Sequence, residues 1–296
     1  DSITTGDYNV GVGDGALTNV TSGAQNIAIG SSALYNNTTG IYNTSVGHQS
    51  LNSNTTASFN TANGYQALKA NTTASNNTAT GYQALYANTT GPQNTAVGYQ
   101  ALYSNTTGAN NTAIGYLALN SSTTASSNTA VGRNSLGSNT TGVENVAMGY
   151  NALSNNTTGI NNTAVGFEAL KLNNTAVDNT AVGFQALDEN TTGSQNTAVG
   201  RNALGKNTTA SGNVAVGRTS LENTTTGYQN TAIGMDAMYT NTTGYDNIAI
   251  GFLARGTSAT TNGQCTLGHT AITNLRCNDT SISSLSDERD KTNIVD

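Results

Sequence analysis

The sequence predicts an all-β protein, a β-solenoid or β-roll built from coils of 17 residues. Asn recurs at every seventeenth position from Asn9 to Asn247, fifteen times in all, and Gly follows each of these Asn residues four positions later, from Gly13 to Gly251. The unit reads N-T-A-V-G-Y-Q-A-L-x-x-N-T-T-G-x-x and fills residues 9–263 without an insertion or a deletion. A two-helix repeat needs more than about 30 residues, so this period excludes a helical solenoid.

We number the places of the unit from its Asn and call the residues that share a place a rank. The opening N-T-A-V-G alternates polar or small residues with apolar ones, as a β-strand does. The third and eighth places hold small residues such as Ala28 and Ala33, which suit a thin coil, and the ninth is Leu from Leu17 to Leu221. The Thr-Thr-Gly segment has the chemistry of a turn. We therefore expect one unit to form one coil, with two short strands and two bends.

Stacking of these coils explains why the repeat length never varies. Adjacent coils should pair like strands at roughly 4.8 Å, so fifteen of them would make a rod of about 70 Å. Identical residues then stack, and Asn side chains at the first and twelfth places can bond amide to amide along the rod. The structural ladder predicted in this way includes Asn9, Asn26, Asn43, Asn60, Asn77, Asn94, Gly13, Gly30 and Gly47.

Aromatic residues gather at the sixth and tenth places. The sixth-place stripe contains Tyr65, Tyr82, Tyr99, Tyr116, Tyr150, Phe167, Phe184 and Phe252, and the tenth-place one Tyr35, Tyr86, Tyr103 and Tyr239. A stripe of rings on a slender rod is either an interface between chains or a platform for a ligand, and we favour the interface. Arg133, Arg201 and Arg218 are expected to interrupt the sixth-place stripe.

The composition excludes several classes of function. Only 9% of the residues are charged, and the formal net charge of −6, with ten Lys and Arg, leaves no basic patch for nucleic acid. No window approaches 18 apolar residues, so we expect no membrane insertion. His48 and His269 lack neighbours at ligand spacing, and the two Cys residues are read as structural thiols, so we expect no metal and no cofactor. The solenoid itself is not expected to be an enzyme.

The A-V-G and A-I-G cores with their small-residue turns resemble the head repeats of trimeric autotransporter adhesins, which are stacked β-rolls packed three to a head. The family repeat is shorter than the 17 residues found here, so the resemblance concerns the pattern and not the length. It implies a homotrimer.

The C-terminal residues carry a sharper resemblance. After Gly268 the repeat stops, and Ser286-Asp287-Glu288-Arg289-Asp290-Lys291 is similar to the opening of the intramolecular chaperone, or S74 peptidase, domain of phage tail fibres and tailspikes. In that family the domain trimerises, guides folding of the fibre and cuts itself off. The resemblance implies Ser286 as nucleophile, Lys291 as base and cleavage of the Leu285–Ser286 bond. The family domain continues for about a hundred residues, whereas this chain stops at Asp296.

We accordingly expect three parts: a solenoid shaft over residues 1–263, a degenerate last coil and connector over 264–285, and the beginning of a chaperone domain over 286–296. The expected function is that of a rigid homotrimeric phage tail-fibre or tailspike shaft in the extracellular part of the virion. Its expected partners are itself, other virion tail proteins and a host-surface receptor such as a polysaccharide.

Two alternatives remain open from the sequence. One is an adhesin head on a bacterial surface, which the same solenoid chemistry would suit. The other is an ice-binding solenoid, because Thr44, Thr61, Thr78, Thr95 and Thr112 form a rank at the second place that could order water. Val10, Ile27, Val146, Val214 and Ile248 break that rank.

Overall fold

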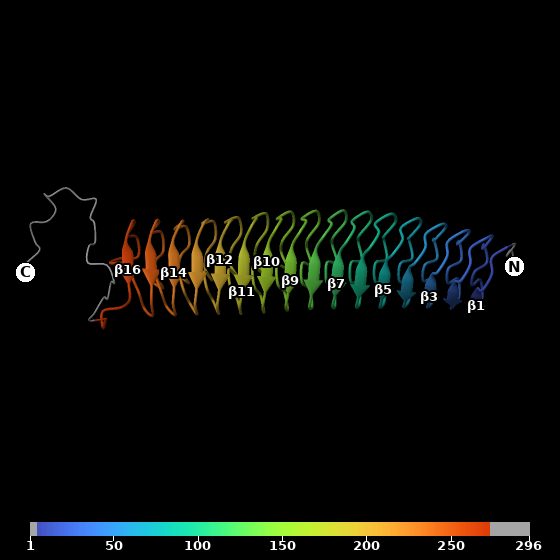
Figure 1. Cartoon of the computed structure of the whole chain (residues 1–296), viewed down its shortest axis with the longest axis horizontal. Helices are drawn as coiled ribbons and strands as arrows, with labels where there is room; N and C mark the ends of the chain where they lie inside the picture. Colours follow the sequence, from blue (N-terminus) through green and yellow to red (C-terminus); the bar gives the residue numbers. More distant parts are fainter. Residues whose placement is uncertain (1–4, 273–296) are drawn as a thin grey trace, which may run out of the picture.

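The computed structural model describes residues 5–272, and this part of the chain is all β, with no helix. It confirms the predicted β-solenoid. Sixteen strands of three residues follow one another along a rod (Figure 1). They are β1 (Val10–Val12), β2 (Ile27–Ile29), β3 (Thr44–Val46), β4 (Thr61–Asn63), β5 (Thr78–Thr80), β6 (Thr95–Val97), β7 (Thr112–Ile114), β8 (Thr129–Val131), β9 (Val146–Met148), β10 (Thr163–Val165), β11 (Thr180–Val182), β12 (Thr197–Val199), β13 (Val214–Val216), β14 (Thr231–Ile233), β15 (Ile248–Ile250) and β16 (Cys265–Leu267).

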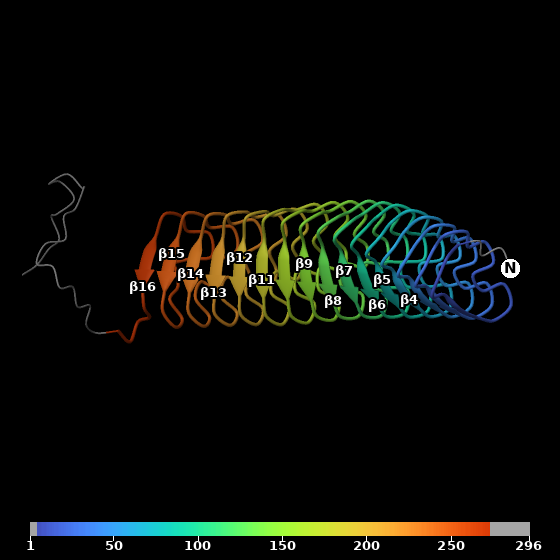
Figure 2. The same cartoon turned by 45° about the vertical axis from the view of Figure 1, so that its right-hand side comes forward.

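The strands form a single parallel sheet in sequence order, each paired with the strand before and after it. The register is set by the repeat: Thr95 of β6 pairs with Thr112 of β7, and Val97 with Ile114. Every residue of a strand therefore lies beside its own counterpart in the next coil. Figure 2 shows the strands side by side as one continuous face.

The expectation of two strands per coil was wrong, because each coil contains one. The residues at the seventh and ninth places have left-handed backbone angles, with φ of 49° at Gln100 and 54° at Leu102, and an extended strand cannot include them. Backbone hydrogen bonds between coils continue nevertheless. The Leu102 N–H donates to the Ala118 carbonyl at 2.9 Å, and the Thr106 N–H to the Thr123 carbonyl at 2.8 Å. Coils are thus bonded to each other around most of the circumference.

The interior is a thin apolar column. The ninth-place Leu residues from Leu34 to Leu221 are fully buried, and the third- and eighth-place Ala residues pack around them in one continuous cluster. Small residues are needed beside each Leu because opposite walls of the coil lie close together. Each Leu contacts apolar neighbours in its own coil and in the adjacent ones, so the core runs the length of the rod.

Two ranks of buried Asn border this column, as predicted. At the first place, Asn43 donates its backbone N–H (2.9 Å) and its Nδ2 (3.1 Å) to Oδ1 of Asn26. At the twelfth place, Asn54 donates Nδ2 to Oδ1 of Asn37 at 2.8 Å. Both ranks converge on one buried carbonyl, that of Ala57, which accepts from Nδ2 of Asn43 at 2.9 Å and of Asn54 at 3.0 Å. Asn suits these places because one amide both donates and accepts.

The fifth-place Gly is required by both its backbone angle and its contacts. At Gly200 φ is 136°, a conformation that residues with a Cβ rarely adopt. A Cβ at Gly200 would also lie 2.6 Å from the carbonyl carbon of Gly217 in the next coil. The same place in each coil therefore tolerates only Gly.

Candidate functional site

The outward side of the sheet is the largest candidate surface. From β2 to β15 the central residue of each strand is buried while the second- and fourth-place residues are partly or fully exposed, as in β7, where Thr112 and Ile114 flank the buried Ala113. The fourth place carries an apolar side chain in most coils, including Ile29 and Ile250, each more than 40% exposed. An apolar strip therefore follows most of the sheet, and Asn63 of β4 and Thr80 of β5 interrupt it.

The sixth-place rings form a second strip, two residues further along each coil. Tyr65, Tyr82, Tyr99 and Tyr116 stack face to face, with ring centroids 5.1–5.2 Å apart. Tyr150, Phe167 and Phe184 form another such stack with the same spacing. All seven of these predicted residues lie on the surface, and each is more than a third exposed. Their faces cover one another, so the stack presents ring edges and hydroxyl groups to its surroundings.

Arginine does not interrupt this strip in the way the sequence suggested. The Arg133 guanidinium lies 5.5 Å from the ring centroids of both Tyr116 and Tyr150, and so joins the two stacks. Arg201 lies 5.6 Å from the ring of Phe184. A planar guanidinium is attracted to an aromatic face, which lets Arg replace a ring at this spacing. Arg218 is the exception, because it pairs with Asp236 (3.7 Å).

A small charged cluster interrupts the neutral surface near β10 and β11. Lys171 Nζ contacts Glu168 Oε1 at 3.0 Å, and Gln185 donates to the other carboxylate oxygen of Glu168 at 3.0 Å. Burial raises the pKa of Glu168, but the hydrogen bonds from Gln185 and Lys171 outweigh it and leave that pKa below its ordinary value. The hydrogen bond to Glu168 raises the pKa of Lys171. Burial raises the pKa of Asp188 in the next coil.

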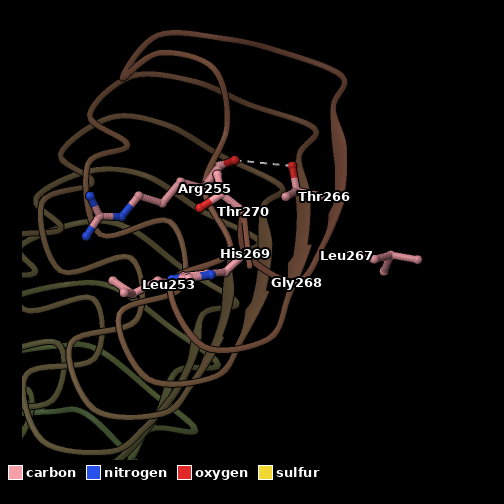
Figure 3. Close-up of a pocket in the computed structure, with 7 residues that line it drawn as sticks. All are labelled: Leu253, Arg255, Thr266, Leu267, Gly268, His269 and Thr270. Carbon is pink, nitrogen blue, oxygen red and sulfur yellow. Dashed lines mark hydrogen bonds between the residues drawn. The ribbon is translucent and has the colours of Figure 1, made fainter. Parts of the chain in front are cut away.

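The C-terminal end of the described solenoid differs from the rest (Figure 3). Arg255 takes the ninth place, and its side chain is exposed where the preceding coils bury Leu or Met. The Thr266 hydroxyl donates to the Arg255 carbonyl at 3.3 Å, and the side chain of Leu267 points away from the coils. The residues that line the hollow at this end are Leu253, Arg255, Thr266, Leu267, Gly268, His269 and Thr270. The apolar column therefore ends under a polar coil.

A second surface hollow lies at the bend between the fourteenth and seventeenth places. It measures about 430 Å³ and is lined by Gln195, Thr209, Ala210, Ser211, Gly212, Thr226, Tyr228 and Gln229. The sequence analysis did not predict this hollow. The signal for it is Gly212, which stands at the seventeenth place, where most coils carry a larger side chain.

The remaining sequence-predicted residues have different outcomes. Ser286 and Lys291, like Cys277, lie outside the described residues, so the self-cleavage pair stays a prediction. Cys265 is exposed and unpaired. In the described range no group of three or more His, Cys, Asp or Glu side chains gathers as metal ligands would. The same range contains no helix with the length and hydrophobicity of a membrane span.

Comparisons of the sequence with family models and curated proteins, and of the fold with solved structures, found no match.

Proposed function

We propose that this chain is the shaft of a homotrimeric phage tail fibre or tailspike, which holds a receptor-binding part at the host surface. The observation that carries the proposal is the apolar strip along the fourth-place rank. Val12, Ile29, Ile114, Ile233 and Ile250 are 40–56% exposed, so the strip reaches from β1 to β15 and is interrupted at Asn63 and Thr80. Soluble monomers rarely expose long rows of apolar side chains of this kind, whereas surfaces that pack against other chains do.

The repeat makes this strip suitable for packing against copies of itself. All but two of the coils place an apolar side chain at the same position, so parallel chains in register would meet with matching shapes along most of their length. The low charge of the chain favours such packing, because like charges would otherwise face each other at every coil. Three rods so joined would be stiffer than one.

Stiffness is the property that a shaft requires. Bonds between adjacent coils come from the sheet, from the turns and from the two Asn ranks, so bending the rod must distort several hydrogen bonds in every coil. A flexible linker with as many residues would leave the position of a distal part undefined. A rod of bonded coils transmits that position.

Maturation by self-cleavage is the second part of the proposal, and it rests on the sequence of residues 286–291. Ser286 would act as the nucleophile toward the Leu285–Ser286 bond, with Lys291 as the base that takes the Ser proton. The solenoid would then end at Leu285.

The test is the mass of the purified particle by light scattering, together with the intact mass of the chain expressed from its complete gene. A particle of three chains, each ending at Leu285, is the expected result, and Ser286→Ala should leave the chain uncut. Ile114→Asp should reduce the trimer, because it places a charge in the apolar strip, whereas Thr124→Asp, exposed at the fourteenth place of the same coil, should not. A monomer with an uncut chain would overturn both parts.

Ice binding is a second candidate, and one observation favours it. The second-place Thr hydroxyls, such as those of Thr95 and Thr112, form no hydrogen bond within the described residues, and they stand in register on a regular sheet. A freezing-hysteresis measurement tests this candidate. An adhesin head on a bacterial surface would use the same trimeric packing, and the absence of cleavage at Leu285 would favour it over a phage fibre.

A further inference from the structure

The hollow at Gly212 arises from a single missing side chain. The seventeenth-place residues of the coils on either side, Gln195 and Gln229, have φ of 61° and 55°, and Gly212 adopts a similar left-handed angle of 72°. The backbone is therefore continuous with its neighbours, but no side chain fills the space between the two Gln residues. A gap one residue wide opens in the rank at this point.

The same gap uncovers one face of an aromatic ring. Tyr228, at the sixteenth place, stacks on Tyr245 of the following coil with centroids 4.8 Å apart and planes within 2°. The preceding coil has Ser211 at this place, so no ring covers the other face of Tyr228, and that ring lines the hollow. This differs from the sixth-place strip, where a ring such as Tyr82 is stacked on both faces.

The polar groups around the ring are uncommitted. The side-chain amides of Gln195 and Gln229 and the hydroxyls of Thr209 and Thr226 form no hydrogen bond within the described residues. Amides and hydroxyls each donate and accept, which matches the hydroxyl groups of a sugar. The hollow of about 430 Å³ is lined by uncharged residues alone.

We propose that this hollow binds one neutral pyranose unit of a polysaccharide. The C–H face of the sugar would stack on the free face of Tyr228, and its hydroxyls would bond to Gln195, Gln229 and the two Thr residues. Asp178 and Asp246 occupy the same rank one coil beyond each Gln, and their charges disfavour an acidic sugar. The inference deepens the proposed function, because host attachment through a polysaccharide needs such a site.

The other ring pair near this bend lacks such a gap. Tyr42 and Phe59 stack at 5.1 Å in the seventeenth-place rank, and the coils beyond them carry Gln25 and Asn76 at that place. Side chains therefore stand at both ends of that stack. Tyr245 and Gly263 repeat the arrangement of Tyr228 and Gly212 one coil beyond the ring pair, but there Asp246 stands beside the missing side chain, where Gln229 lines the hollow at Gly212.

The decisive variant is Gly212→Gln, which restores the side chain of the rank. Gln already adopts this backbone angle in the two adjacent coils, and a Cβ at Gly212 would lie at an ordinary 3.4 Å from Cγ of Gln229, so the fold should be kept. Tyr228→Ser removes the ring in a second way. Gln93→Asn, a change in the same rank several coils away, is the matched control.

Binding would be measured by saturation-transfer NMR and calorimetry with neutral oligosaccharides of glucose, galactose, mannose and N-acetylglucosamine, and with a sialylated oligosaccharide. We expect at least one neutral probe to bind the unaltered protein and Gln93→Asn equally, and at least tenfold more weakly to Gly212→Gln and Tyr228→Ser. Binding of no neutral probe, equal binding by Gly212→Gln, or preference for the sialylated probe would overturn the site.

Light scattering on the same samples separates this inference from the proposed function. A trimer that binds no neutral probe would overturn the sugar site and leave the shaft intact. A monomer whose binding is lost in Gly212→Gln would support the sugar site and contradict the trimeric shaft.

Discussion

The buried ranks and the outward ranks of this solenoid follow different rules. The first place is Asn and the fifth is Gly in all fifteen coils, whereas the sixth place holds Asp, Ser, His, Tyr, Arg, Phe or Met. A buried residue lies against its own counterparts above and below, so it must be complementary to itself in donors, acceptors and volume. An outward residue also contacts its counterparts, but its other side faces solvent, so different residues such as Tyr and Arg can follow one another there. The interior therefore defines the fold, and the outward ranks are where function can vary.

The largest expected effect comes from placing a side chain in the fifth-place rank. Gly200→Val requires a β-branched residue at a φ of 136° and within contact of the Gly217 backbone. Backbone strain and overpacking each cost on the order of 1–3 kcal/mol, so we expect a loss of about 4 kcal/mol in the free energy of unfolding. Chemical denaturation followed by circular dichroism measures it. A loss below about 1 kcal/mol would show that the coils can separate locally.

The next effect concerns the apolar column. Leu102→Ala removes a fully buried side chain between rigid coils that cannot close the cavity, and should cost about 2–5 kcal/mol. Ser104→Ala changes an outward place of the same coil and should alter the free energy of unfolding by less than about 0.5 kcal/mol. Equal effects of the two substitutions, measured by denaturation, would contradict the distinction between buried and outward ranks.

A stabilising substitution sharpens the same comparison. The twelfth-place Asn rank is broken at Ser122, and both Asn105 Oδ1 and Ser122 Oγ are buried without a hydrogen-bond partner. Ser122→Asn would restore the bond from Nδ2 to Oδ1 that Asn88 and Asn105 form at 2.9 Å. We expect a gain of about 1 kcal/mol in the free energy of unfolding, visible as a higher midpoint in denaturant.

The reverse change is the control for this gain. Asn88→Ser should lower the free energy of unfolding, because Asn71 Oδ1 loses its donor and the Gly91 carbonyl keeps only the bond from Asn94. If Ser122→Asn left the free energy of unfolding unchanged while Asn88→Ser lowered it, the hydrogen bonds restored at Ser122 would make no net contribution to stability.

The sequence predicted the interior well and the surface less well, for the same physical reason. Periodic Asn, Gly and Leu residues defined the coil, its register and the buried amide ranks, because each depends on self-complementary stacking. The second strand was predicted wrongly. The backbone at Gln100 and Leu102 is left-handed, and because Gln and Leu normally avoid that conformation, their presence in the sequence did not indicate it. The bridging role of Arg133 depends on its two ring neighbours along the rod, and the hollow at Gly212 on a free ring face. Neither is visible in a single unit.

The smallest expected effect lies in the outward charge pair of Glu168 and Lys171. Both side chains are partly exposed to water, so Lys171→Met should lower the free energy of unfolding by less than about 1 kcal/mol. The pKa of Glu168 is below its ordinary 4.5 and that of Lys171 above its ordinary 10.5. The pair therefore contributes fully between these two ordinary values. Its contribution falls as the pH drops through the lowered pKa of Glu168, and again as the pH rises through the raised pKa of Lys171.

The measurement is the difference in unfolding free energy between the unaltered protein and Lys171→Met at pH 3, 7 and 9. The difference should be largest at pH 7 and 9 and smaller toward pH 3, as Glu168 takes up a proton and the attraction weakens. Asp188 adds to the difference near neutral pH: burial raises its pKa, and loss of the Lys171 charge would raise that pKa further, so its ionised form costs the variant additional stability. A difference that stayed constant down to pH 3 would mean that Lys171 contributes through packing of its alkyl chain, as a buried rank does, and not through charge.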